Sequence, residues 1–171
     1  VLVFIIQSTS FIYLVNTDVA SAPIPPSERS GYLEEWTAGD GIKEVSLYLK
    51  EEHNKEPNNQ IVVGTEGYFG TLPDGLQMYM EGVSGVVVKG VGLHLNELPS
   101  DLVESKKAGN KTYLVINKSR IKANPSDIGL TMIAEFPKAP RTPDSHDYTL
   151  YGPQEILYFF EVTQIDSMLR L

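Results

Sequence analysis

The chain has 171 residues, of which 42% are hydrophobic and 21% are charged, a size and balance that suit one globular domain. Its 14 lysines and arginines against 22 aspartates and glutamates give a net charge of −8, which argues against a nucleic-acid partner, because phosphate binding needs a basic face. The absence of cysteine excludes disulfides, thiolate nucleophiles and cysteine-based zinc sites.

The first 15 residues, VLVFIIQSTSFIYLV, contain no charged side chain. A membrane-spanning helix needs about 20 apolar residues. Because the chain also does not begin with Met, we expect residues 1–17 to be the end of a transmembrane helix that begins upstream. Two alternatives stay open: a secretory signal cleaved after the small residues Ala20, Ser21 and Ala22, or a buried core helix.

The following segment, residues 18–30, is expected to be an extended linker, since three prolines disfavour both a helix and a central strand. Residues 31–165 are then expected to form a soluble α/β domain. Its first helix is predicted over residues 41–53, where Ile42, Val45 and Leu49 form one apolar stripe.

Three strands alternate with two further helices in the middle of the chain. The strands are predicted at residues 61–63, 85–91 and 112–117, and the helices at 74–82 and 99–109. The β-branched runs of the first two strands indicate burial on both faces. The β-α-β-α-β order, with connections long enough for crossovers, predicts a small doubly wound and mainly parallel sheet.

The last third of the chain has a different character. Residues 128–136 and 156–162 have the composition of strands, and the proline-rich segment 137–143 and the tract after it show no helical period. We expect these two strands to be antiparallel additions at the edge of the sheet. Residues 166–171 are expected to be a loose C-terminus.

The longest loop follows the first strand and contains Gly64, Gly67 and Gly70. Their spacing matches neither a dinucleotide-binding fingerprint nor a Walker loop, so we interpret the glycines as turn-forming residues. Glu66 and Asp74 could act as an acid/base pair in this loop. The simpler interpretation is that Asp74 caps the next helix and Glu66 is solvated.

Ligands of open α/β sheets bind outside the carboxyl ends of the strands. Segments 64–74, 92–96 and 117–120 are therefore predicted to converge on one rim. On that rim, Glu66, Tyr68 and Asn117 provide a carboxylate, an aromatic ring and an amide that suit sugar hydroxyls.

Two aromatic residues four positions apart, Tyr32 and Trp36, follow the linker. They could stack on a sugar ring, lie at a bilayer interface, or pack the linker onto the domain. The three histidines lie far apart in the sequence, and we predict no metal site, no cofactor and no catalytic residue in this chain.

Two runs of sequence resemble a known family. They are RSGYLEEWTAGDGIKE, from residue 29 to 44, and VVGTEGYFGTLPDGL, from residue 62 to 76. Two shorter segments, YLVIN at 113–117 and FPK at 136–138, are similar as well. They resemble the C-terminal soluble region of bacterial membrane glycosyltransferases of the dolichyl-phosphate-mannose protein mannosyltransferase-like group, which includes the lipid A aminoarabinose transferases.

The resemblance implies many membrane spans before Val1, a polyprenyl-phosphate-linked sugar donor, and catalytic acids in an early external loop outside this chain. It implies a location at the cell membrane, with the soluble domain on the extracytoplasmic side. The expected partners are the membrane-embedded part of the same chain and a glycan or lipid-linked sugar. On this interpretation the chain is a non-catalytic accessory domain that positions an acceptor or stabilises the membrane part. The alternative is a freestanding secreted α/β enzyme or binding module with a site around Glu66 and Asp74.

Overall fold

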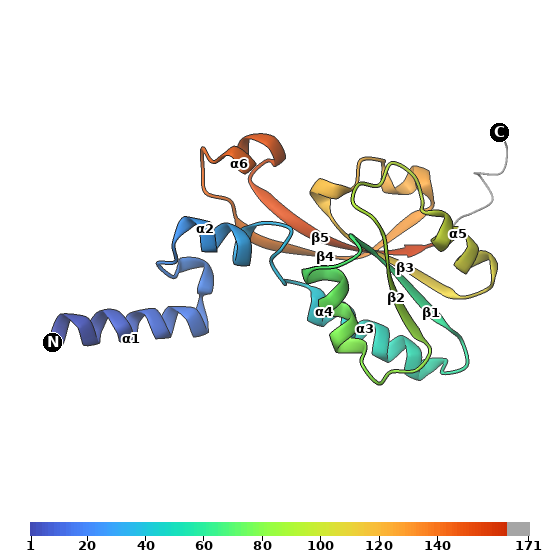
Figure 1. The fold of residues 1–171 in the computed structure, drawn as a ribbon, viewed down its shortest axis with the longest axis horizontal. Coiled ribbons are helices and arrows are strands. Elements are labelled where there is room, and N and C mark those ends of the chain that lie inside the picture. Colours follow the sequence, from blue (N-terminus) through green and yellow to red (C-terminus); the bar gives the residue numbers. More distant parts are fainter. Residues whose placement is uncertain (164–171) are drawn as a thin grey trace.

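The computed structural model describes residues 1–163, and its centre is a five-stranded mixed sheet in the order β2-β1-β3-β5-β4 (Figure 1). The strands are β1 (Ile61–Glu66), β2 (Val86–Gly92), β3 (Lys111–Asn117), β4 (Leu130–Pro140) and β5 (Gln154–Val162). β1 pairs parallel with β2 and β3, whereas β5 pairs antiparallel with β3 and β4. The predicted α/β class, parallel core and antiparallel C-terminal strands are confirmed. The predicted loose C-terminus, residues 166–171, lies outside the described residues.

Helices cover both faces of the sheet, as expected for a doubly wound fold. α3 (Ile42–Lys55) and α4 (Thr71–Met80) pack on one face, where Val45 and Leu76 lie in one cluster with Val63 of β1. α5 (Ser100–Lys107) packs on the other, where Leu102 lies in a second cluster with Leu114. Successive residues of β1 therefore contribute to opposite cores, which explains its continuous apolar run.

The two valine-rich strands differ in burial. Every residue of β1 is buried, whereas β2 is the edge strand and its residues are half-buried or exposed, with Val87 41% exposed. The prediction that β2 is buried on both faces is therefore wrong. Composition alone does not separate an edge strand from a central one, because both favour β-branched residues.

β4 and β5 form a long hairpin that extends beyond the parallel strands (Figure 1). β4 continues through Pro137 to Pro140, past the strand end expected at residue 136. Prolines are tolerated here because β4 is an edge strand and needs no donor on its free side. A short helix that the sequence analysis missed, α6 (His146–Tyr151), connects the two strands, and the Ser145 hydroxyl accepts a hydrogen bond from the Tyr148 amide at its start.

The N-terminal helix α1 (Leu2–Thr17) projects away from the α/β domain (Figure 1). None of its residues is buried, so the alternative of a buried core helix is wrong. Within residues 1–163, no helix has both the length and the apolar character needed to cross a membrane.

The segment after α1 is not extended throughout. It contains the short turn η1 (Val19–Ser21), the helix α2 (Pro26–Arg29) and the π-helical turn η2 (Ser30–Glu34). Pro26 occupies the first position of α2, where its missing N–H costs nothing and its fixed φ suits a helix. The expectation of a wholly extended linker is therefore corrected.

Buried ion pairs fasten residues 29–39, which we call the strap, to the β4–β5 hairpin. The Arg141 guanidinium donates to both carboxylate oxygens of Glu35 and, at 2.9 Å, to Oε2 of Glu155. The Lys138 ammonium donates to the backbone carbonyls of Glu35 and Ala38 at 3.0 and 2.8 Å. Because these groups are desolvated and mutually satisfied, they hold the strap in one position.

Candidate functional site

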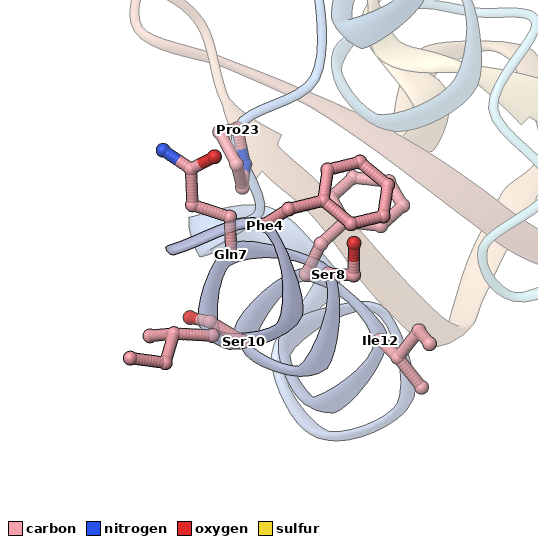
Figure 2. Close-up of a pocket in the computed structure, with 8 residues that line it drawn as sticks. Phe4, Gln7, Ser8, Ser10, Ile12 and Pro23 are labelled. Atoms are coloured by element: carbon pink, nitrogen blue, oxygen red, sulfur yellow. The ribbon is translucent and has the colours of Figure 1, made fainter. Parts of the chain in front are cut away.

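One hollow of the molecule, of about 670 Å³, lies along α1. Figure 2 shows its labelled side chains, among them Phe4, Gln7 and Ile12, projecting outward from the helix, and Pro23 of the linker lies beside them. None of the residues that line it carries a charge, and none provides a carboxylate, imidazole or amine for acid/base chemistry. The candidate site lies instead at the carboxyl ends of the parallel strands.

There, an apolar pocket of about 170 Å³ lies between the loop after β1, the loop after β2, the end of β3 and the strap. Its apolar wall consists of Trp36, Tyr68, Phe69, Leu72, Pro73 and Leu93. Glu66 and Arg120 add one charge of each sign. Residues from all three predicted rim segments line this pocket, and the topology explains why: parallel neighbouring strands end on the same edge.

Glu66 ends β1 and is buried, with 4% of its surface exposed. The β1–β2 register shifts between Thr65 and Glu66, and such a bulge redirects a side chain. Oε2 of Glu66 accepts a hydrogen bond from the Asn117 amide N–H at 2.6 Å, and Oε1 accepts one from Nδ2 of Asn117 at 2.7 Å. The expectation that Glu66 is solvated is therefore wrong. Burial raises the pKa of Glu66, although both hydrogen bonds from Asn117 act to lower it.

Asn117 connects three parts of the chain at the back of the pocket. Besides binding Glu66, its Nδ2 donates to the backbone carbonyl of Trp36 at 3.3 Å. Its Oδ1 is buried and has no hydrogen-bond partner among the described residues. Asn117 thus holds the end of β1 and the strap against the end of β3.

Two glycines place Tyr68 at the mouth of the pocket. Gly67 has a φ of 72°, which side-chain-bearing residues rarely adopt. At Gly90 of β2, a Cβ atom would lie 2.2 Å from the carbonyl oxygen of Gly67 and 2.7 Å from Cα of Tyr68. The loop therefore crosses β2 at Gly90, where the absence of a side chain lets the loop backbone pass.

The Arg120 guanidinium stacks on Trp36, with its central carbon 4.8 Å from the ring centroid. Nη1 of Arg120 also lies 3.4 Å from Nε2 of His94. The Trp36–Arg120 pair also lines a second pocket of about 260 Å³. The other residues there are mostly polar, and they include Ser30, Glu35, Thr37, His94, Ser119 and Asp147. The two pockets therefore share one wall and have opposite chemical character.

The six residues predicted to bind substrate fall into three groups. Trp36, Glu66 and Tyr68 line the apolar pocket, and Asn117 orients Glu66 from behind. Tyr32 is exposed and is not among the residues that line either rim pocket.

Asp74 does not line the rim pockets either. α4 begins at Thr71, and the Asp74 carboxylate accepts a hydrogen bond from the Gly70 amide at 3.0 Å. Asp74 thus caps the helix from inside its first turn. Its negative charge there also interacts favourably with the positive end of the helix dipole. Because Asp74 and Glu66 have different partners, the structure does not form the acid/base pair that the loop suggested.

The sequence analysis did not single out Phe69, Leu93, His94 or Arg120. All four fall within the predicted rim segments, so their position at the strand ends could have identified them as candidate site residues. The contributions of Gly90 and Asp147 carried no local signal, because each depends on how a distant segment folds across the rim.

Within residues 1–163, no group of three or more histidine, aspartate or glutamate side chains is arranged to hold a metal ion. No family model matches the chain, and no characterised protein or solved structure matches it. The functional proposal below is therefore based on the geometry of the site and on the sequence resemblance.

Proposed function

We propose that this chain is the extracytoplasmic accessory domain of a polytopic membrane glycosyltransferase that uses a polyprenyl-phosphate-linked sugar donor. The observation that supports it most directly is α1, an uncharged apolar helix whose large side chains are exposed, for example Phe4 at 72% and Ile12 at 61%. Such a surface is unfavourable in water and suits hydrocarbon. The sugar donor and the side of the membrane come from the resemblance.

The connection between α1 and the domain supports a positioning role. Nη1 of Arg29 donates to the carbonyl of Ala20 in η1, and Nε of Arg29 pairs with Glu34 in the strap. Glu35 then pairs with Arg141 of the hairpin. Because each contact is at least partly buried, the segment that follows α1 is held in a fixed position on the domain. If α1 lies in the bilayer, the rim would then be kept at a defined distance from the membrane surface. The domain would then present an acceptor or stabilise the membrane part, while the catalytic acids lie outside this chain.

The second candidate is a freestanding secreted binding module or enzyme. The rim pocket favours it, because a small apolar pocket with convergent charged groups is typical of a ligand site. An enzyme with a Glu66–Asp74 pair is less favoured, since Asp74 is occupied at the start of α4.

Membrane association is tested by flotation of the chain with vesicles of zwitterionic phospholipid. The double variant Ile5→Lys, Ile12→Lys places two charges on α1, and the control Leu47→Lys, Met78→Lys makes the same change at exposed positions of α3 and α4. We expect the wild-type chain and the control to float, and the α1 variant to remain in the aqueous fraction. Equal flotation of both variants would contradict the proposal.

The accessory role is tested by a transfer assay. The chain alone should transfer no sugar from a polyprenyl-phosphate donor to added glycan acceptors. Turnover above a heat-inactivated control would show that the chain is itself the enzyme.

A further inference from the structure

The Trp36–Arg120 pair separates two pockets that accept different chemistry. On one side lie the apolar side chains of Phe69, Leu72 and Leu93, and on the other lie polar groups such as Ser119 and Asp147. A ligand that reaches the pockets on both sides of this pair needs an apolar part for the first pocket and a polar part for the second.

The volumes limit the size of each part. A water molecule occupies about 30 Å³ in the liquid, so the apolar pocket of about 170 Å³ has room for about six non-hydrogen atoms. By the same measure the polar pocket of about 260 Å³ has room for about nine, enough for the ring of a monosaccharide and some of its hydroxyl groups. These sizes suit a single sugar that carries a short apolar group, or the first carbons of a longer one.

The charges argue for an uncharged polar part. The Arg120 guanidinium is the cationic group of the shared wall, while the carboxylates of Glu66 and Asp147 lie on either side of it. A phosphate would meet these carboxylates as well as the guanidinium, and an ammonium group would meet the guanidinium. Sugar hydroxyls avoid both conflicts, because each can donate to a carboxylate and accept from a guanidinium.

The shared wall is held in place before any ligand arrives. Asn117 binds the backbone of Trp36, Arg120 covers its ring, and the strap is fastened by Glu35 and Arg141. The polar pocket is completed by α6, which lies at the same end of the molecule as α2 (Figure 1). A preorganised aromatic wall lowers the entropic cost of binding.

We propose that the rim binds an uncharged glycoside, with its sugar ring in the polar pocket against Asp147 and Arg120 and its apolar aglycone in the pocket between Trp36, Phe69 and Leu93. This inference goes beyond the proposed function, since it concerns a ligand of the isolated chain. It requires neither a bilayer nor a membrane-embedded partner.

Tryptophan fluorescence is the test, because Trp36 is the only tryptophan of the chain and lines both pockets. The full chain is titrated, without lipid, with n-hexyl β-glucoside, β-galactoside and β-mannoside below their micellar concentrations, and with the free sugars, 1-hexanol and hexyl phosphate. We expect at least one hexyl glycoside to change the Trp36 emission saturably, with a half-saturating concentration about tenfold or more below those of its free sugar and of hexanol, since the aglycone adds buried apolar area.

Two variants, each with a matched control, test which pocket holds the aglycone and which holds the sugar ring. Leu93→Asn should weaken binding of the hexyl glycoside about tenfold and leave the free sugar unaffected, because it makes the apolar wall polar. Asp147→Asn should weaken both ligands. The controls Leu47→Asn and Asp127→Asn make the same changes at exposed positions on α3 and in the turn before β4, away from the rim, and should bind as the wild-type chain does.

Several results would overturn the inference. Hexanol binding as tightly as the glycosides would leave only an apolar pocket, and tighter binding of hexyl phosphate would make the rim an anion site. No saturable change with any of the three glycosides, or equal weakening by a control variant, would remove the glycoside site. None of these results affects the flotation test, so this inference and the proposed membrane role can fail separately.

Discussion

Folded proteins usually bury apolar side chains and expose charged ones, and two regions of this molecule depart from that pattern in opposite ways. α1 exposes large apolar side chains along its whole length, whereas the junction of the strap with the hairpin buries Glu35, Lys138, Arg141 and Glu155, with Arg141 only 2% exposed. At the junction each buried charge has a partner within the chain. For α1 the described residues provide no cover. The buried charges of the junction are explained by contacts within the chain. The exposed apolar side chains of α1 have no such explanation among the described residues, and they are the basis of the membrane proposal.

The largest effect is expected from breaking the buried junction. Arg141→Met leaves Glu35 and Glu155 in the interior without their cation and should lower the free energy of unfolding by about 3–5 kcal/mol, measured by urea denaturation. The control Lys106→Met removes a long, partly exposed contact with Glu161 and should cost at most about 1 kcal/mol. Similar losses in both variants would mean that the junction is not a buried charge cluster.

A smaller effect is expected at Glu66, a buried carboxylate with only neutral hydrogen-bond partners. Glu66→Ala leaves the amide N–H and Nδ2 of Asn117 without this acceptor and should cost about 1–3 kcal/mol. Glu66→Gln should cost less, because its side-chain carbonyl oxygen can still accept one of the two hydrogen bonds from Asn117 and no charge remains buried. Thermal unfolding of the two variants tests this order, and a Gln variant less stable than the Ala variant would contradict it.

The contribution of the buried Lys138 to stability is expected to depend on pH. Burial lowers the pKa of Lys138 from 10.5 to about 8, so the folded chain loses this proton at a lower pH than the unfolded chain. Between pH 8 and pH 10.5 the unfolded state therefore holds more protons, and this group makes folding more favourable as pH rises.

The free energy of unfolding of the wild-type chain should thus rise relative to that of Lys138→Met over this interval. Tyrosine ionisation is common to both proteins and cancels in the difference. A difference that stays constant with pH would show that Lys138 titrates normally.

The smallest effect on stability is expected at α1. The variant Ile5→Lys, Ile12→Lys should change the free energy of unfolding by no more than about 0.5 kcal/mol, because exposed positions rarely contribute more. Circular dichroism during urea unfolding measures it. A loss of several kcal/mol would mean that α1 packs against the domain after all.

The order of the five strands and of helices α3, α4 and α5 follows from the sequence alone. Apolar stripes such as Ile42, Val45 and Leu49, and the β-branched run at residues 61–63, are local patterns that local backbone geometry converts into helices and strands. The alternation of these elements then implied parallel pairing and a rim at the strand ends. The apolar character of α1 was equally evident, although what covers it was not.

Tertiary structure decided which of several similar segments is buried and what meets at the rim. The valine runs of β1 and β2 differ in burial because β1 lies between two strands and β2 lies at the edge. Glu66 and Asp74 fall in the same predicted loop segment, yet Glu66 ends β1 and is turned inward by the bulge and by Asn117, whereas Asp74 lies in the first turn of α4. Trp36 and Arg120 meet because the strap is held against the end of β3 by Asn117 and against the hairpin by Arg141. Each of these outcomes depends on contacts between residues far apart in the chain, which local sequence preferences do not encode.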